Sequence, residues 1–337
     1  MEAIRAAPQP NLTLADYTIG WICTKHIEYD AAQLFLDETH PDIAPSNGGH
    51  TYTLGKIGKH NVVIATMANM FREEATATNL ICSMKSAFPN ISINLMVGIG
   101  SGAPSLTHDI RLGDVVVSAP DPESGSPAVF AYNFDKTVQD GTLHEITPHL
   151  NRPLSLLMSS VGSLHTSYRL KGHQIEDDIS SILEKRPGLR QKYERPQLSS
   201  DRLYKSTVNH PLNNEEGRKI SYEKDVSMLV QRPERARNKA NPCIHHGTIA
   251  SGCQVMKDAI IRDKLISENN DIVCFDTEVV RVFMYNVPGL VVRGICDYSD
   301  SHKNEEWQGY AAMTAAAYAK DIVRNIPPST GFRKRMF

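Results

Sequence analysis

The sequence predicts an α/β domain in which strands and helices alternate around one central sheet. Short apolar runs that suit buried strands alternate with longer segments whose apolar residues recur at helical spacing. Hydrophobic residues make up 41% of the 337 residues and charged residues 22%, so the chain has enough apolar material for a sizeable core. The sequence contains no internal repeat, and α/β folds of this length are often single domains.

The expected elements follow one another from residue 17 to residue 326, which we take as the domain. Gly58, Lys59 and His60 separate two apolar runs and predict a hairpin. We expect strands at 17–23, 51–57, 61–67, 91–97, 114–118, 272–275 and 290–296. We expect helices at 27–37, 73–88, 153–164, 254–267, 279–283 and 306–325. Residues 1–16 and 327–337 are predicted to be tails.

A polar insertion at about 167–241 interrupts the alternation. It is charged, contains several prolines and has few aliphatic side chains. Between residues 185 and 239, fourteen Lys and Arg residues face seven Asp and Glu residues, although the whole chain carries a net charge of −2. Such a stretch is either a solvated loop or a flap that attracts phosphate. Its tyrosines are widely spaced and no nucleic-acid-reading motif accompanies them, so we expect no nucleic-acid partner.

The composition also bears on the cellular compartment. No apolar run approaches the roughly 20 residues that span a bilayer, and the first residues lack a basic start followed by an apolar core. The six cysteines have no CxxC spacing, and four of them lie in apolar, strand-like segments. We therefore expect a cytoplasmic protein with reduced thiols, no membrane partner and no zinc site.

Two carboxylates stand where expected strands end, in the segment from 271 to 303. Glu278 follows the run at 272–275, and Asp297 follows the run at 290–296. In open α/β sheets, ligands gather beyond the carboxyl ends of the strands. The pair could supply an acid and a group that binds hydroxyls. The alternative is structural, with Glu278 at a helix N-terminus and Asp297 capping a loop.

A glycine-rich run, GIGSG at 98–102, follows the expected strand at 91–97. A dinucleotide-binding loop would need a helix next and an acid about twenty residues later. Another strand is expected at 114–118 instead, so we reject that interpretation. Backbone amides in a glycine turn can still approach an anion or a base closely. A plain tight turn is the alternative.

Three motifs give the chain a family resemblance: VVRGICDYSDSHK at 291–303, GTIASG at 247–252 and FDTE at 275–278. Together they resemble the purine and uridine phosphorylase superfamily, in particular a fungal branch often fused to signalling repeat domains. This branch is related to the methylthioadenosine/adenosylhomocysteine nucleosidases. The resemblance implies a three-layer α/β sandwich with a mixed central sheet and helices on both faces. It also implies a homodimer that uses no metal or organic cofactor.

The resemblance assigns roles to individual residues. Asp297 matches the acid that protonates purine N7, and Arg293 in the same strand is expected to support it electrostatically. Glu278 matches the carboxylate that binds the ribose hydroxyls, and Glu28 matches the glutamate that orients the attacking water. A glutamate in the first turn of a helix is the structural alternative for Glu28. The remaining pocket residues expected from the resemblance are Gly98, Gly100, Ser251, Val255, Met256 and Thr277.

The nucleophile can be inferred from position 96. Phosphorylases of the superfamily place an arginine just before the glycine turn to hold phosphate, whereas this chain has Met96. Phosphate needs charge-assisted hydrogen bonds to bind in competition with water, so we expect hydrolysis rather than phosphorolysis. Thr277 replaces the methionine expected under the ribose, and Cys253 replaces a polar residue. A phosphorylase and a catalytically impaired purine-binding signalling module therefore remain as alternatives.

The substrate is expected to be a purine nucleoside or a nucleotide such as ATP. The basic insertion ends shortly before the base-facing segment at 247–256 and could cover the 5′ side of the ribose. Its charges closest in sequence to that segment are Arg232, Arg235 and Arg237, which we expect to meet a phosphate chain.

Overall fold

The computed structural model describes residues 12–43, 50–67, 74–120, 126–132, 153–208, 225–235, 242–252, 254–269, 271–303 and 305–328. The strands are β1 Ile19–Cys23, β2 Glu38–Thr39, β3 Tyr52–Ile57, β4 His60–Thr66, β5 Ile93–Gly102, β6 Val115–Ser118, β7 Val129–Tyr132, β8 Ile244–Gly252, β9 Ile272–Thr277 and β10 Gly289–Asp297. The α-helices are α1 His26–Leu34, α2 Glu74–Ala87, α3 Ser155–Lys171, α4 Ile175–Lys185, α5 Arg190–Tyr193, α7 Ala259–Glu268, α8 Glu278–Asn286 and α9 Gln308–Asn325.

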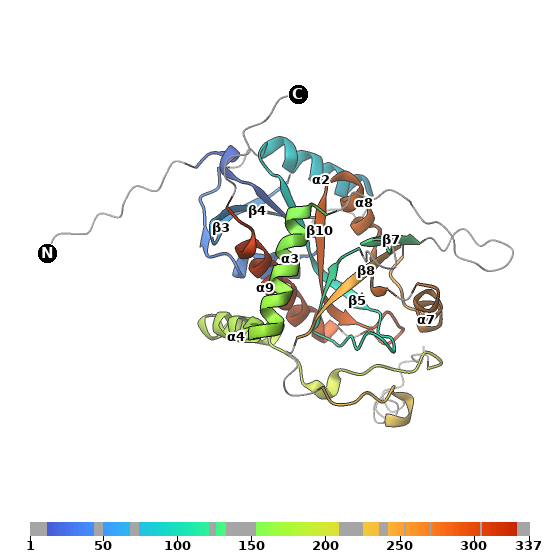
Figure 1. The fold of residues 1–337 in the computed structure, drawn as a ribbon. Coiled ribbons are helices and arrows are strands. Elements are labelled where there is room, and N and C mark those ends of the chain that lie inside the picture. Colours follow the sequence, from blue (N-terminus) through green and yellow to red (C-terminus); the bar gives the residue numbers. More distant parts are fainter. Residues whose placement is uncertain are drawn as a thin grey trace.

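Strand β5 is the centre of a mixed sheet. It pairs in parallel with β1 and β10, and its last residues pair in antiparallel fashion with β9. From β10 the pairing continues through β6 and β8 to β9, so these strands close a ring that returns to β5. Strands β4, β3 and β2 extend the sheet beyond β1. The mixed α/β fold with helices around the sheet confirms the predicted fold class (Figure 1).

Helix α9 lies against the sheet and is almost entirely buried. Its run of small residues lets it approach β10 closely: a Cβ on Gly294 would lie 1.8 Å from the carbonyl oxygen of Ala311. Helices α1, α3, α4 and α5 pack on α9, whereas α2 and α8 pack together elsewhere on the sheet (Figure 1). Among the described helices, none is both long enough and apolar enough to cross a membrane.

The glycine-rich run does not form the predicted turn. Residues 98–102 continue β5 to its end, and all of them are buried. Close packing explains why glycine is needed here. A Cβ on Gly98 would lie 2.4 Å from the carboxyl carbon of Glu28, and a Cβ on Gly100 would lie 2.7 Å from the sulfur of Cys274. The prediction of a turn was therefore wrong, and the glycines instead make room beside an extended strand.

The predicted insertion contains more regular structure than its composition indicated. Helix α3 continues to Lys171, and α4 follows with a buried stripe of Ile175, Ile179 and Leu183 at spacings of four residues. This stripe packs against the domain core, and α4 contacts α9. The first part of the insertion is thus part of the domain rather than a solvated loop, because a narrow apolar stripe buries it.

Candidate active site

A pocket opens where β5, β8, β9 and β10 end. Its volume is about 670 Å³, including the space at its mouth. The sheet register explains why these ends meet, because Ser101 of β5 lies beside both Phe275 of β9 and Asp297 of β10. The pocket wall combines apolar side chains such as Met67, Met256 and Phe275 with a few polar ones.

Asp297 lines this pocket at the end of β10 and is 8% exposed. Its Oδ1 accepts a hydrogen bond of 3.0 Å from the amide of Ser299, and its Oδ2 lies 3.2 Å from the ammonium of Lys303. Ser299 adopts a φ of +58°, a conformation that non-glycine residues rarely take and that often accompanies functional sites. The carboxylate is therefore held by its own loop while facing the pocket.

Glu28 lies behind the pocket wall in the first turn of α1 and is 3% exposed. Its Oε2 accepts from the amide and hydroxyl of Thr24, at 2.6 and 2.9 Å, and from the amide of Lys25, at 3.0 Å. Its Oε1 accepts from the amide of Ile99, at 3.0 Å. These three partners line the pocket. Glu28 thus caps its helix, as the structural alternative predicted, and also joins α1 to β5.

A buried ion pair lies beside Glu28. Arg293 is 1% exposed, and its Nε donates a hydrogen bond to Oδ2 of Asp276, which lines the pocket. Burial would lower the pKa of Arg293, but the negative charges of Asp276 and Glu28 outweigh this effect and raise it. Arg293 therefore stays charged. The partner it bonds is Asp276, whereas we had expected it to support Asp297.

The remaining predicted pocket residues fall into two groups. Gly100, Val255, Met256 and Thr277 line the pocket. The hydroxyl of Ser251 instead donates to the carbonyl of Thr277, at 2.8 Å, and joins β8 to β9. Gly98 contributes the space that Glu28 occupies. The backbone of Glu278 begins α8 directly after β9.

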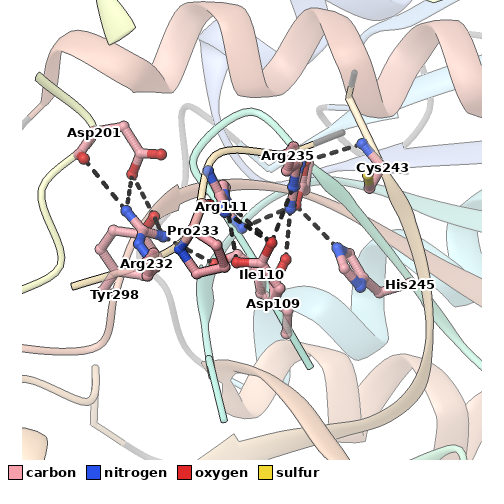
Figure 2. A network of polar contacts seen from close by, with 11 residues as sticks. Asp109, Ile110, Arg111, Asp201, Arg232, Pro233, Arg235, Cys243, His245 and Tyr298 are labelled. Atoms are coloured by element: carbon pink, nitrogen blue, oxygen red, sulfur yellow. Dashed lines mark hydrogen bonds and ion pairs between the residues drawn. The ribbon is translucent and has the colours of Figure 1, made fainter. Parts of the chain in front are cut away.

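The structure places two of the three predicted phosphate-binding arginines away from the pocket wall. Arg232 donates to the hydroxyl of Tyr298 at 2.7 Å and to Asp201 at 3.1 Å. Arg235 donates to Asp114 at 2.8 and 2.5 Å and to Asp109 at 3.2 Å (Figure 2). Both guanidinium groups are mostly buried against carboxylates of the chain itself. Arg237 lies outside the described residues.

Sequence reasoning missed several pocket residues. Thr24, Lys25, Ser101, Asp276 and Lys303 line the pocket, and none of them was predicted to do so. Asp276 lies in the FDTE motif with Glu278, and Lys303 ends the motif that contains Asp297. Their place in these motifs could have predicted that they reach the pocket. Thr24 and Lys25 reach the pocket because β1 ends beside β5, which only the register of the sheet defines.

The sequence predicted reduced cysteine thiols and no metal site. The five cysteines within the described ranges carry free thiols, and Cys23, Cys274 and Cys296 are buried. Burial raises the pKa of each of these three thiols. Among the residues that the structure describes, no three His, Cys, Asp or Glu side chains are grouped so that they could hold a metal ion.

The chain was compared with known proteins by sequence and by structure. No family model matches the chain. A nucleotide-binding leucine-rich repeat (NLR)-like protein of Hyaloscypha variabilis is 35% identical over 326 residues, which cover 96% of this chain. The chain spans only 31% of that relative's length.

Several solved structures share the architecture. A 5′-methylthioadenosine/S-adenosylhomocysteine nucleosidase of Neisseria meningitidis superposes with a TM-score of 0.52 at 11% identity, over 91% of this chain and 98% of the other. A putative nucleosidase of the same kind from Borrelia burgdorferi, bound to adenine, gives 0.54 at 14% identity, over 91% and 99%. The enzyme of S. pneumoniae gives 0.54 at 13%, over 92% and 100%. The chain therefore has the nucleoside phosphorylase/hydrolase-like fold, which is the fold of the purine and uridine phosphorylase superfamily, as its motifs predicted.

Proposed function

We propose that the pocket hydrolyses the N-glycosidic bond of a purine nucleoside or nucleotide and releases the free base. One observation carries this proposal: the buried acid Asp297 and the residues that hydrogen-bond a second carboxylate, Glu28, line the same pocket. Glycosidic hydrolysis uses such a pair, one group assisting the leaving group and the other the water. The likeness in fold to purine nucleosidases supports the same chemistry.

In this mechanism the purine lies against Met256 and Phe275, and Asp297 donates a proton to N7. The bond between N9 and the anomeric carbon then breaks, and the base leaves neutral rather than as an anion. Water attacks the anomeric carbon from the other side and forms the new C–O bond. Glu28 accepts the proton that the water loses, and its negative charge also stabilises the oxocarbenium-like transition state.

Glu28 has the acceptor capacity for this role. A carboxylate offers about four lone-pair sites. Among the described residues, three donors converge on Oε2 while Ile99 donates to Oε1. Oε1 thus keeps a lone pair for a water molecule at the wall formed by Thr24 and Ile99. The capping bonds fix the orientation of this carboxylate, which a general base requires.

Water rather than phosphate is the proposed nucleophile. Met96, at the position where phosphorylases of the superfamily place an arginine, is fully buried in β5. Among the residues that the structure describes, the pocket wall has the cations Lys25 and Lys303, and Lys303 pairs with Asp297. Lys25 is therefore the residue we propose to meet a 5′ phosphate chain if the substrate is a nucleotide such as ATP. Adenine is the favoured base, in keeping with the adenine bound to the Borrelia neighbour.

Three further parts of the proposal rest on the family resemblance: the protein is a homodimer, it needs no metal or organic cofactor, and Glu278 binds the ribose hydroxyls. A cytoplasmic location is proposed from the composition of the sequence. The alternative is a purine-binding module without turnover, which the NLR-like relative makes worth testing. Calorimetric binding of a purine nucleoside without release of base would favour that alternative.

The proposal is tested by incubating the protein with a panel of purine nucleosides and nucleotides and separating free base by chromatography. Asp297→Asn should fold normally and lose roughly 10²–10⁴-fold in turnover, because asparagine cannot donate the proton. Asp258→Asn is a matched control at the start of α7, where asparagine also caps a helix. Release of base by Asp297→Asn at the wild-type rate would remove this acid from the mechanism.

A further inference from the structure

Two legs of the insertion run side by side outside the loop that follows Asp297. We call residues 198–208 and 225–235 the strap, and residues 298–303 the acid loop. The amide of Val230 donates to the carbonyl of Leu203, and the amide of Lys205 donates to the carbonyl of Met228, both at 2.9 Å. The two legs therefore form one paired unit rather than two independent loops.

The strap holds the residue next to the acid. The hydroxyl of Tyr298 donates to Oδ1 of Asp201, and Arg232 donates to both Tyr298 and Asp201 (Figure 2). Tyr298 is 3% exposed. Burial and the negative charge of Asp201 raise the pKa of Tyr298, so the hydroxyl keeps its proton and remains a donor. Arg232 donates to the same hydroxyl oxygen, which completes a closed triangle.

The strap also contacts residues that follow Ser299, through Tyr204 and Ser200. The ring of Tyr204 stacks on His302 with centroids 3.8 Å apart and planes 12° from parallel. The indole of Trp307 donates to the hydroxyl of Ser200 at 3.0 Å. The strap therefore meets the acid loop at Tyr298 and at His302, on either side of Ser299.

The strap is itself fixed to the sheet. Arg235 forms two hydrogen bonds with Asp114, which is fully buried just before β6, and Arg111 donates to the carbonyl of Pro233 at 2.6 Å. Burial alone would raise the pKa of Asp114, but the hydrogen bonds from Arg235 and His245 outweigh it and lower the pKa to about 2. Asp114 therefore stays charged at neutral pH, and its ion pair with Arg235 fixes the strap relative to the sheet.

The acid loop needs such support. Ser299 occupies the left-handed region at φ +58°, and residues persist there only when their surroundings over-determine them. The domain itself contacts the acid loop at two points. Arg262 of α7 donates to the carbonyl of Tyr298 at 2.7 Å, and the hydroxyl of Ser299 donates to the carbonyl of Gly102 of β5 at 3.2 Å. The strap supplies the further contacts to Tyr298 and His302. The amide of Ser299 then holds the Asp297 carboxylate at 3.0 Å.

We propose that the strap positions Asp297 for proton transfer, with Asp201, Tyr298 and Arg232 as the positioning residues. This inference rests on the proposed function and gives Arg232 a role other than phosphate binding. Displacement of a catalytic group by about 1 Å can cost roughly 10²-fold in rate. Loosening the triangle should therefore slow the step that needs the acid and leave substrate binding almost unchanged.

The test compares two leaving groups. Cleavage of a purine nucleoside needs protonation of the base, whereas 4-nitrophenolate leaves from a 4-nitrophenyl riboside without an acid. The variants are Tyr298→Phe and Arg232→Gln. Their matched controls are Tyr168→Phe, which removes a hydroxyl bonded to Asp321, and Arg195→Gln, which removes a cation paired with Glu176. Thermal melting verifies that each variant is folded.

We expect kcat for the purine nucleoside to fall roughly 10- to 100-fold in Tyr298→Phe and Arg232→Gln. KM and the rate for the nitrophenyl riboside should stay within about three-fold, as should both rates in the controls. Equal losses for the two leaving groups, or no loss for the purine, would overturn the positioning role while leaving the hydrolase intact. A wild-type protein that releases no base overturns the proposed function itself.

If the pocket does not accept the nitrophenyl riboside, a second measurement tests the proposal with the purine substrate alone. In an Asp297→Asn background, Tyr298→Phe should cause no further loss of purine cleavage, because the two residues act through one group. Losses that multiply would contradict the proposal.

Discussion

Replacing Glu28 by glutamine would test whether its carboxylate is as tightly held as the contacts indicate. The change keeps the size of the side chain but removes its charge and turns one acceptor oxygen into a donor. The best orientation keeps an oxygen toward Thr24 and Lys25, so the new NH2 group faces the amide of Ile99. Ile99 is buried, and its amide would lose its partner.

The magnitude follows from these contacts. Leaving one buried donor unsatisfied costs about 1–3 kcal/mol. Converting the remaining charge-assisted bonds to neutral ones weakens each by a fraction of that amount. We expect Glu28→Gln to lower the free energy of unfolding by roughly 2–5 kcal/mol and to slow base release at least ~100-fold, since the water loses its base.

Urea denaturation and a turnover assay on the same preparation measure both effects. Asp30→Asn is the matched control, because it makes the same charge change on the same helix. Asp30 pairs with Lys192 and Tyr193 at a half-exposed position, so its replacement should cost under about 1 kcal/mol. An unfolding midpoint of Glu28→Gln equal to that of the wild type would refute the tight binding of this carboxylate.

Two further predictions concern the strand beside the pocket and the pH dependence of stability. Gly98→Ala should displace the Glu28 carboxylate, since the new Cβ would lie 2.4 Å from it; we expect a loss of roughly 1–3 kcal/mol and of most activity, and an unchanged melting temperature would contradict this. Burial and the neighbouring His165 and His245 lower the pKa of His246 from 6.5 to about 4. Stability present above pH 6.5 should therefore be lost as pH falls toward 4, by up to roughly 3 kcal/mol. His246→Gln should flatten this slope, and an unaltered slope would assign it to other groups.

The sequence was most informative where apolar pattern and motif agree. The strands ending at Thr277 and Asp297, and α9 after them, were expected within a few residues of their observed bounds. Most residues of these segments are buried, so the segments carry long apolar runs that indicate their boundaries. The place of Asp297 at the end of a strand was expected from this pattern, whereas its role as the acid was expected from the family resemblance.

Other features depend on contacts between distant segments and escaped prediction. The glycines at 98–102 indicated a turn, because the sequence does not reveal that Glu28 and Cys274 crowd β5. Arg232 was interpreted as a phosphate ligand from local charge alone. Its partners Asp201 and Tyr298 are 31 and 66 residues away, and only the fold brings them together.

The most direct measurement of the central claim is mass spectrometry of the sugar product after turnover of a purine nucleoside or nucleotide in ¹⁸O-labelled water. The reaction is run with and without inorganic phosphate. If the pocket hydrolyses the N-glycosidic bond as proposed, free base appears in both reactions and one ¹⁸O atom is found at the anomeric carbon. Phosphate-dependent release of base with an unlabelled sugar 1-phosphate would contradict the account and identify a phosphorylase.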